Sequence, residues 1–98
     1  MELHEIPEAF QSKLRLVIIS MLITGDKTFS ELKSITKATD GNLSVQLTKL
    51  EEWGYVSITK TFVLKKSHTV AALTERGKCD FEAYVKLLSD LITVKEGE

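Results

Sequence analysis

The sequence predicts a mostly α, α+β fold in one domain over residues 1–98, with three helices, a β-hairpin and a C-terminal helix. The length of 98 residues suits a single compact core. Apolar residues follow a helical period in four segments, and they alternate with a period of two between the third and the fourth. Glycines fall where these patterns stop or start, as is typical of turns. The expected order is therefore helix, helix, helix, strand, strand, helix.

The first helix is expected over residues 7–24. Its apolar side chains follow helical spacing and form a stripe wider than a single packing partner requires. Pro7 suits the first helical turn, and Gly25 suits the position just past the end of the helix. We therefore expect a helix that is covered on two sides.

Two short helices joined by a small turn are expected next, over residues 30–37 and 41–53. Ser30 is placed to cap the first, whose Ile35 would point inward together with a neighbouring leucine. Asp40 is placed to cap the second, in which three leucines at i, i+4 and i+7 form one buried stripe. This pattern predicts a helix-turn-helix unit.

Residues 55–73 are expected to form a β-hairpin. Residues 55–62 alternate between apolar and polar side chains and are rich in β-branched and aromatic types, which is typical of a strand. Residues 69–73 form the second expected strand, and residues 63–68 form the loop between the two. A helix-turn-helix followed at once by a β-hairpin is the winged-helix layout, in which the second short helix enters the major groove of DNA.

Several segments also resemble the signature of small MarR/ArsR-like winged-helix transcriptional regulators. They are Phe29-Ser30-Glu31-Leu32-Lys33, Asp40-Gly41-Asn42-Leu43-Ser44, Leu47 with Leu50-Glu51-Glu52, Gly54-Tyr55-Val56 and Leu73-Thr74-Glu75-Arg76-Gly77. The resemblance extends from about residue 13 to about residue 88. Each segment alone is common among winged helices. Together, in this order and spacing, they imply a winged-helix fold and a DNA-binding regulator.

The helix over residues 41–53 is the expected recognition helix. With its leucines facing the core, its opposite face presents side chains that can bond base edges or phosphates. The resemblance implies that the positions of Asn42, Ser44 and Gln46 meet DNA. The candidate DNA-binding residues of this helix and of the turn before it are Thr39, Gly41, Asn42, Ser44, Val45, Gln46, Thr48 and Lys49. The alternative is a solvated helix face whose first turn is rich in capping residues.

The hairpin supplies a second group of candidate DNA-binding residues, which are Lys60, Lys65, Lys66, Ser67, His68 and Thr69. Residues 61–80 contain four basic and two acidic side chains, a local charge of +2 that suits contact with phosphates. Alternatively, the lysines protect an exposed strand edge from aggregation. The expected loop also lacks glycine, and its Leu64 is able to pack on a partner instead of DNA.

The last helix is expected over residues 75–93, with Thr74 as its N-cap. Its apolar stripe and that of the first helix exceed what a small three-helix core absorbs. The resemblance implies that such helices pair across a two-fold axis and space two recognition helices about one DNA turn apart. The candidate dimer-interface residues are Phe10, Ile19, Ile23, Phe81, Tyr84, Leu88 and Leu91. The alternative is that Ile19, Ile23 and Leu91 complete the core of a monomer.

Composition argues against several other classes of protein. The single cysteine, Cys79, excludes an intramolecular disulfide and a multi-cysteine metal site, and we expect it to be a buried structural thiol. No catalytic motif, phosphate-binding glycine loop or cluster of metal ligands is evident, so we expect no enzyme activity, no metal and no cofactor. No apolar run approaches the roughly 18 residues of a membrane span. We therefore expect no membrane contact and a cytoplasmic location, and the sequence identifies no effector ligand.

The sequence thus predicts a homodimeric regulator that binds double-stranded operator DNA in a sequence-specific manner. A winged-helix module that binds another protein is the main alternative, and a DNA-bending protein without sequence preference is a third. The net charge of −1, from 13 basic and 14 acidic residues, implies modest non-specific affinity for DNA. A continuous positive strip from Lys49 through the hairpin lysines to Arg76 would favour DNA. Its interruption by Glu51 and Glu52 would favour a protein partner.

Overall fold

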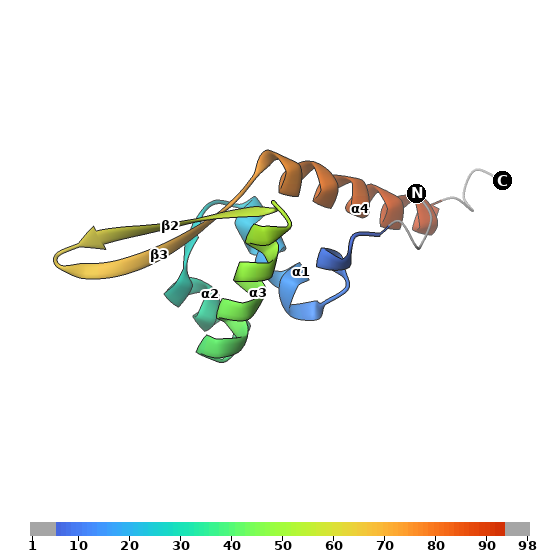
Figure 1. The fold of residues 1–98 in the computed structure, drawn as a ribbon. Coiled ribbons are helices and arrows are strands. Elements are labelled where there is room, and N and C mark those ends of the chain that lie inside the picture. Colours follow the sequence, from blue (N-terminus) through green and yellow to red (C-terminus); the bar gives the residue numbers. More distant parts are fainter. Residues whose placement is uncertain (1–5, 94–98) are drawn as a thin grey trace.

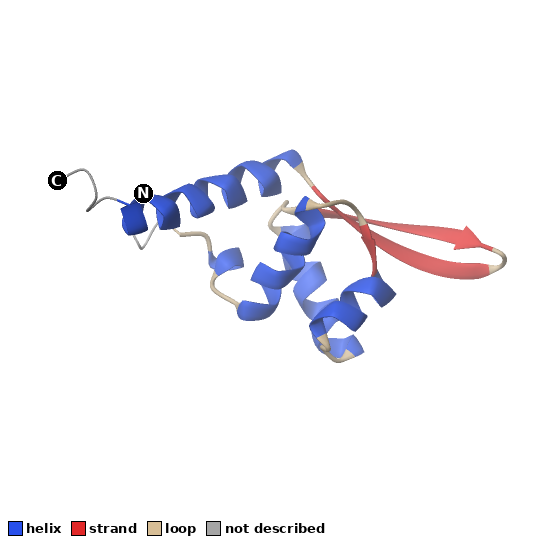
Figure 2. Cartoon of the chain, turned by 180° about the vertical axis from the view of Figure 1, so that it is seen from behind, coloured by secondary structure: helices blue, strands red, loops and turns tan. Residues whose placement is uncertain are grey.

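The molecule consists of a helical body and a long β-hairpin that projects from it (Figure 1). A computed structural model describes residues 6–93. Along the chain the elements are a 3₁₀ helix η2 (Glu8–Phe10), α1 (Lys13–Ile23), β1 (Lys27–Thr28), α2 (Phe29–Thr36), α3 (Asp40–Glu52), β2 (Val56–Val63), β3 (Lys66–Leu73) and α4 (Glu75–Thr93). From the base of the hairpin, α4 runs back over the body, away from the hairpin (Figures 1 and 2). The predicted winged-helix fold, mostly α with a hairpin wing, is confirmed.

The segment expected as one helix over residues 7–24 is divided into η2 and α1, so that expectation is wrong. Ser12 lies between the two in an extended conformation, and its hydroxyl accepts a hydrogen bond from the backbone N–H of Arg15 (3.3 Å). A serine hydroxyl competes with the helical backbone for such bonds, which favours a cap at this position. The chain therefore changes direction before α1 and places Ala9 and Phe10 in the core.

The N-cap of α2 is Thr28 and not Ser30. The Thr28 hydroxyl accepts the N–H of Glu31 (3.1 Å), and the Glu31 carboxylate accepts the N–H of Thr28 (2.8 Å), which completes a capping box. The hydrogen bond from the Thr28 backbone lowers the pKa of Glu31 below its ordinary value, because it stabilises the charged form. Leu32 is buried as expected, but Ile35 is exposed because it lines an open hollow beside α1.

The N-cap of α3 is Thr39 and not Asp40, since the Thr39 hydroxyl accepts the N–H of Asn42 (3.1 Å). Asp40 is the first helical residue, where its charge suits the positive end of the helix dipole. It also pairs with Lys33 (Nζ to Oδ1, 2.6 Å), an exposed ion pair that contributes little to stability. The three leucines of α3 are buried as predicted. Gly54 follows the helix at a φ of +84°, a conformation that favours glycine.

The sheet contains a strand that the sequence analysis did not predict. The order is β1-β3-β2, and both pairs are antiparallel. The two residues of β1 pair with Val70 and Ala71 in β3. Because β1 leads directly into α2, this pairing ties the helix-turn-helix to the base of the hairpin.

The turn of the hairpin is shorter than expected. β2 and β3 pair without interruption from Val56↔Leu73 to Val63↔Lys66, so the expected loop over residues 63–68 is wrong. Only Leu64 and Lys65 lie between the strands, at φ values of +51° and +67°. A two-residue turn with both φ angles positive matches the right-handed twist of the strands, but it is usually built from asparagine and glycine. The sequence therefore did not indicate it.

Thr74 joins the end of α3 to the start of α4. Its hydroxyl accepts the backbone N–H of Gly77 (3.0 Å), which confirms it as the N-cap of α4. The same hydroxyl donates to the carbonyl oxygen of Gly54 (2.7 Å). The helix then packs aromatic side chains on the core, where the rings of Phe81 and Tyr84 lie 5.8 and 5.1 Å from that of Phe10.

Three expectations about burial are wrong. Phe10 and Ile19 were assigned to a dimer interface, but they are 2% and 0% exposed within the domain itself. Both lie on the faces of η2 and α1 that form the core, so they are not available to a second subunit. Cys79 was expected to be buried, but it is exposed because it lies on the side of α4 opposite Phe81 and Tyr84, which pack on the core. Within residues 6–93, no helix is long and apolar enough to cross a membrane.

Gly77 provides a test of the packing between α4 and the hairpin. A Cβ at Gly77 would collide with the carbonyl oxygen of Tyr55 and lie 2.8 Å from Leu73 Cδ1. We expect Gly77→Ala to lower the free energy of unfolding by about 1 to 3 kcal/mol, although alanine favours helices. Gly41→Ala is the control, because a Cβ there meets nothing within 4 Å. Urea denaturation followed by circular dichroism measures both; equal stabilities would contradict the close approach.

Candidate nucleic-acid interface

The exposed face of α3 carries most of the residues predicted to meet DNA. Its capping turn and first two turns present small polar and amide side chains, and Lys49 follows one turn later. The exposed members are Thr39, Gly41, Asn42, Ser44, Val45, Thr48 and Lys49. Val45 is 50% exposed although it is apolar, which suits contact with a thymine methyl group. Gln46 differs from the others, since it is half-buried.

The structure brings the second half of this face together with the base of the hairpin. A hollow of about 330 Å³ separates α3 from β2 and β3. Ser44 and Thr48 line it from the helix, and Lys60 and Thr69 line it from the strands. Residues from the two predicted groups thus form one continuous surface. Glu51 lines the same hollow, so an acidic side chain lies among them.

The outer half of the hairpin carries the remaining basic residues. Lys65, Lys66 and Ser67 are exposed at and beside the turn, and His68 is half-buried. No acidic residue occurs between Gly54 and Thr74 in the sequence. The charge of the hairpin is therefore positive, and it is concentrated at Lys60 and at the turn.

The positive strip that would favour DNA is not continuous from Lys49 through the hairpin lysines to Arg76. Glu51 interrupts the strip in the hollow between α3 and the hairpin, and Arg76 does not line that hollow. The guanidinium of Arg76 covers the ring of Tyr55 (5.2 Å to the centroid) and approaches Asp80 (3.9 Å). Burial raises the pKa of Tyr55, and the neighbouring Asp80 raises it further. Arg76 thus lies over Tyr55 and near Asp80, and it does not line the hollow with Lys60.

A buried arginine that the sequence analysis overlooked connects the body to the recognition helix. The Arg15 guanidinium donates to the carbonyl oxygens of Ala9 (3.2 Å) and Glu8 (3.0 Å) and to Gln46 Oε1 (2.7 Å). It also lies over the ring of Trp53, 5.2 Å from the centroid. The sequence did contain a sign of this buried group, because an arginine lies within the apolar stripe of the first helix. A charged side chain at such a position requires hydrogen-bond partners inside the protein.

Gln46 connects Arg15 to Asn42 through a second hydrogen bond. While its Oε1 accepts from Arg15, its Nε2 donates to Asn42 Oδ1 (3.2 Å). Both atoms of the Gln46 amide are therefore engaged within the chain. Gln46 is accordingly placed to orient Asn42, whose own amide nitrogen remains available as a donor.

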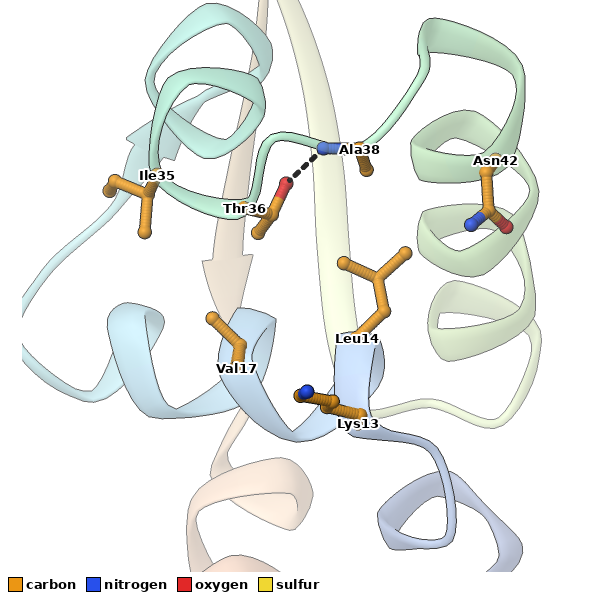
Figure 3. Close-up of a pocket in the computed structure, with 7 residues that line it drawn as sticks. All are labelled: Lys13, Leu14, Val17, Ile35, Thr36, Ala38 and Asn42. Carbon is orange, nitrogen blue, oxygen red and sulfur yellow. Dashed lines mark hydrogen bonds between the residues drawn. The ribbon is translucent and has the colours of Figure 1, made fainter.

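A second hollow, of about 440 Å³, lies between α1, α2 and the start of α3 (Figure 3). Its lining residues are Lys13, Leu14, Val17, Ile35, Thr36, Ala38 and Asn42. The Asn42 side chain points toward this hollow from α3 (Figure 3). Asn42 therefore lies at the border between the hollow and the exposed face of the recognition helix.

Within residues 6–93, no group of three or more His, Cys, Asp and Glu side chains is arranged to hold a metal ion. Most polar groups of the exposed face are hydroxyls, amides and ammonium groups, which bond phosphates and base edges, and the carboxylate of Glu51 lies among them.

Comparison with known proteins agrees with the geometry. The family described as the winged helix DNA-binding domain matches residues 14–92. An uncharacterized protein of Methanocaldococcus jannaschii is 34% identical over 77 residues, which cover 78% of this chain and 84% of that protein.

Among solved structures, a transcriptional regulator homologue from Pyrococcus horikoshii OT3 has 28% identity and a TM-score of 0.75, covering 97% of this chain and 94% of that one. A MarR-family transcriptional regulator of Enterococcus faecalis V583 has the same fold, with a TM-score of 0.77 at 22% identity; the match covers 91% of this chain and 81% of that one.

Replacing Arg15 tests the link between the body and the recognition helix. Arg15→Met leaves three acceptors without their donor, and we expect the free energy of unfolding to fall by about 2 to 4 kcal/mol. Lys13→Met is the control on the same helix, because Lys13 is exposed, and we expect a change below about 0.5 kcal/mol. Urea denaturation measures both. Similar losses in the two variants would show that the buried guanidinium has no special role.

Proposed function

Because the chain belongs to the winged helix DNA-binding domain family, we propose that it is a sequence-specific transcriptional regulator that binds operator DNA as a homodimer. The observation that carries the proposal is the hollow shared by α3 and the hairpin, which is lined by Ser44 and Thr48 on one side and Lys60 and Thr69 on the other. A surface that combines a polar helix with a cationic hairpin suits one duplex better than two separate partners. The similar solved structures, which are named as transcriptional regulators, support the same proposal.

In the proposed complex, α3 enters the major groove with its first turns closest to the bases. Asn42 is the main candidate for base contact, because its amide nitrogen is a free donor and its Oδ1 retains a second lone pair. Ser44 and Thr48 bond bases or phosphates, and Val45 meets a thymine methyl group. Gln46 acts through Asn42 by holding its amide in place. The hairpin then follows the backbone and neutralises phosphates.

The number of cations on this surface makes dimerisation important for affinity. Lys49, Lys60, Lys65 and Lys66 are the lysines of the proposed interface. If each neutralises a phosphate, the logarithm of affinity falls against the logarithm of salt with a slope of about −4 for one subunit and about −7 for two. A single subunit would therefore bind weakly at physiological salt.

The apolar stripe on the second half of α4, which continues the face of Phe81 and Tyr84, is the proposed dimer interface. Phe81 and Tyr84 are half-buried against the chain's own core, so they contribute little to a second subunit. Leu88 and Leu91 are 41% and 57% exposed, and Ile23 at the end of α1 is 43% exposed. Val85 and Ile92 extend the same exposed stripe on α4. An amphipathic helix with a bare apolar stripe is the usual element of a two-fold interface.

A protein-binding role is the second candidate, and the position of Glu51 favours it. An acidic side chain in the hollow between α3 and the hairpin repels phosphate but suits a basic peptide.

Selection of bound sequences from random DNA, followed by titration at two salt concentrations, separates the two proposals. Enrichment of one sequence with a strong salt dependence supports the regulator. Failure to enrich any sequence would favour the protein-binding role.

The hairpin lysines give a prediction for the salt titration. We expect Lys65→Ala combined with Lys66→Ala to weaken binding similarly for all sequences and to reduce the salt slope by about 1 to 2 per subunit. Lys86→Ala is the matched control, because Lys86 lies on α4 and pairs with Asp90 (3.0 Å). Fluorescence anisotropy with a labelled duplex measures the slope. An unchanged slope in the double variant would remove the hairpin from the binding surface.

The dimer interface gives a prediction for the oligomeric state. We expect Leu88→Asp to produce monomers, because two aspartates would face an apolar partner surface without counter-charges. Ile35→Asp is the control, since Ile35 has nearly the same exposure, 44%, and lies on α2. Sedimentation velocity distinguishes monomer from dimer. A dimer that persists in the first variant, or is lost equally in the second, would contradict the assignment to α4.

A further inference from the structure

Three hydrogen-bonded side chains lead from the core to the exposed face of α3. Arg15 is 8% exposed, and its guanidinium donates to Gln46 Oε1 (2.7 Å). Gln46 is half-buried, and its Nε2 donates to Asn42 Oδ1 (3.2 Å). Asn42 is exposed in the first turn of α3. We call these three residues the amide relay, because each hydrogen bond fixes the orientation of the next side chain.

The direction of both hydrogen bonds in the amide relay is set by Arg15. A guanidinium has only donors, and it stays charged at every physiological pH. The amide of Gln46 must therefore turn its oxygen toward Arg15, which leaves its nitrogen to face Asn42. That nitrogen is a donor, so Asn42 in turn presents its oxygen to Gln46. The orientation of two amides thus follows from one buried cation.

Arg15 is itself held in place by other contacts. Its Nε and Nη2 donate to the carbonyl oxygens of Ala9 (3.2 Å) and Glu8 (3.0 Å), and the ring of Trp53 lies 5.2 Å from the guanidinium carbon. Rotation of the guanidinium would break these bonds in the core, where a lost partner is expensive. The bond to Gln46 joins a charged donor to an amide oxygen, and such bonds are stronger than those between neutral groups.

The amide relay leaves Asn42 with one free end. Within residues 6–93, its amide nitrogen donates to no acceptor, whereas its oxygen already accepts one hydrogen bond. An unrestrained asparagine offers either end of its amide to a partner, because the amide can turn end for end. The relay removes this choice for Asn42, so its side chain meets a partner mainly as a donor.

The base edges in the major groove differ in how they suit a donor. Guanine presents two acceptors, N7 and O6, whereas cytosine presents only the donor group at N4. Adenine and thymine each present an acceptor, so a donor rejects neither of them. A side chain that is held as a donor therefore discriminates most strongly between guanine and cytosine.

We propose that Arg15 and Gln46 are positioning residues that set a base preference of α3. They hold Asn42 as a donor, so that the helix selects guanine over cytosine at the position that Asn42 contacts. The proposal rests on the proposed function, since it takes α3 to lie in the major groove. Neither positioning residue needs to touch DNA for this purpose.

Gln46→Glu reverses the amide relay while it keeps the length of the side chain. One carboxylate oxygen accepts from Arg15, and the other has no hydrogen to donate to Asn42. The amide of Asn42 then turns end for end and donates its nitrogen to the carboxylate, which leaves its own oxygen free. A free oxygen accepts from the N4 group of cytosine. Gln46→Met is the matched control, because it removes the relay and lets Asn42 turn either way.

The experiment uses the full chain and the duplex selected from random DNA, with each base pair of the site set in turn to G·C and to C·G. Fluorescence anisotropy gives the ratio of the two affinities at each position. Asn42→Ala identifies the position that Asn42 contacts, because the ratio there should fall to one. Each ratio cancels the uniform loss of affinity that the negative charge of Gln46→Glu causes on every duplex.

We expect the native protein to favour guanine over cytosine at this position by about five-fold, Gln46→Glu to favour cytosine by a similar factor, and Gln46→Met to bind both duplexes equally. In nitrogen-resolved NMR spectra of the free protein, the side-chain N–H signals of Asn42 should move downfield in Gln46→Glu, since they gain a carboxylate acceptor.

The inversion separates this proposal from a purely structural role of Gln46, which would weaken binding without changing the preferred base. A native protein without the preference, or a Gln46→Glu variant that still favours guanine, would overturn the amide relay and leave the proposed function standing. Ratios that are the same in Asn42→Ala and the native protein would do the same. Absence of any duplex binding would overturn both proposals.

Discussion

The buried guanidinium of Arg15 is the interaction on which the position of the recognition helix depends. Removing a charged group from water is expensive unless all its donors find partners. Here those partners come from η2 and α3, and the ring of Trp53 covers the guanidinium. The cost of burying the charge is therefore offset only when η2, α1 and α3 occupy one mutual arrangement. Within residues 6–93, no buried side-chain polar atom is left without a hydrogen bond, so alternative arrangements would lose contacts.

The hairpin and α4 are attached to this body at a second point. Thr74 bonds both the end of α3, through Gly54, and the start of α4, through Gly77. β1 adds a third attachment by pairing with β3 just before α2 begins. The recognition helix and the hairpin are thus both held to the same core, which is why residues of the two lie around one hollow. The proposed binding of DNA requires such a rigid spacing between α3 and the hairpin.

Periodicity predicted the architecture because it reports the largest free-energy term, the burial of apolar side chains. The stripe of leucines in α3 and the alternation at the start of β2 are therefore visible in the sequence, whereas Phe62 continues the alternation in β2 but is exposed. The errors concern smaller, competing terms. Ser12 interrupts a helical pattern with a single hydroxyl, and the capping box of Thr28 and Glu31 was present as a Thr-x-x-Glu pattern but was not used. In the candidate site, exposure of the α3 face followed from its polarity. The hydrogen bond between Arg15 and Gln46 could not be predicted from the sequence. The two residues are 31 positions apart, so the bond leaves no local pattern.

The separation between the core and the outer hairpin also affects how such a protein can change over generations. From Thr61 to Ser67 every side chain is exposed, and the strands there are held by pairing to each other alone. Substitutions at exposed positions usually alter stability by less than about 0.5 kcal/mol. Substitutions of exposed side chains in the outer strands of the hairpin therefore disturb the fold little, whereas each change on α3 must preserve three buried leucines and the contact with Arg15. Among descendants of this chain, substitutions would accumulate first at the end of the hairpin, where they cost the fold least.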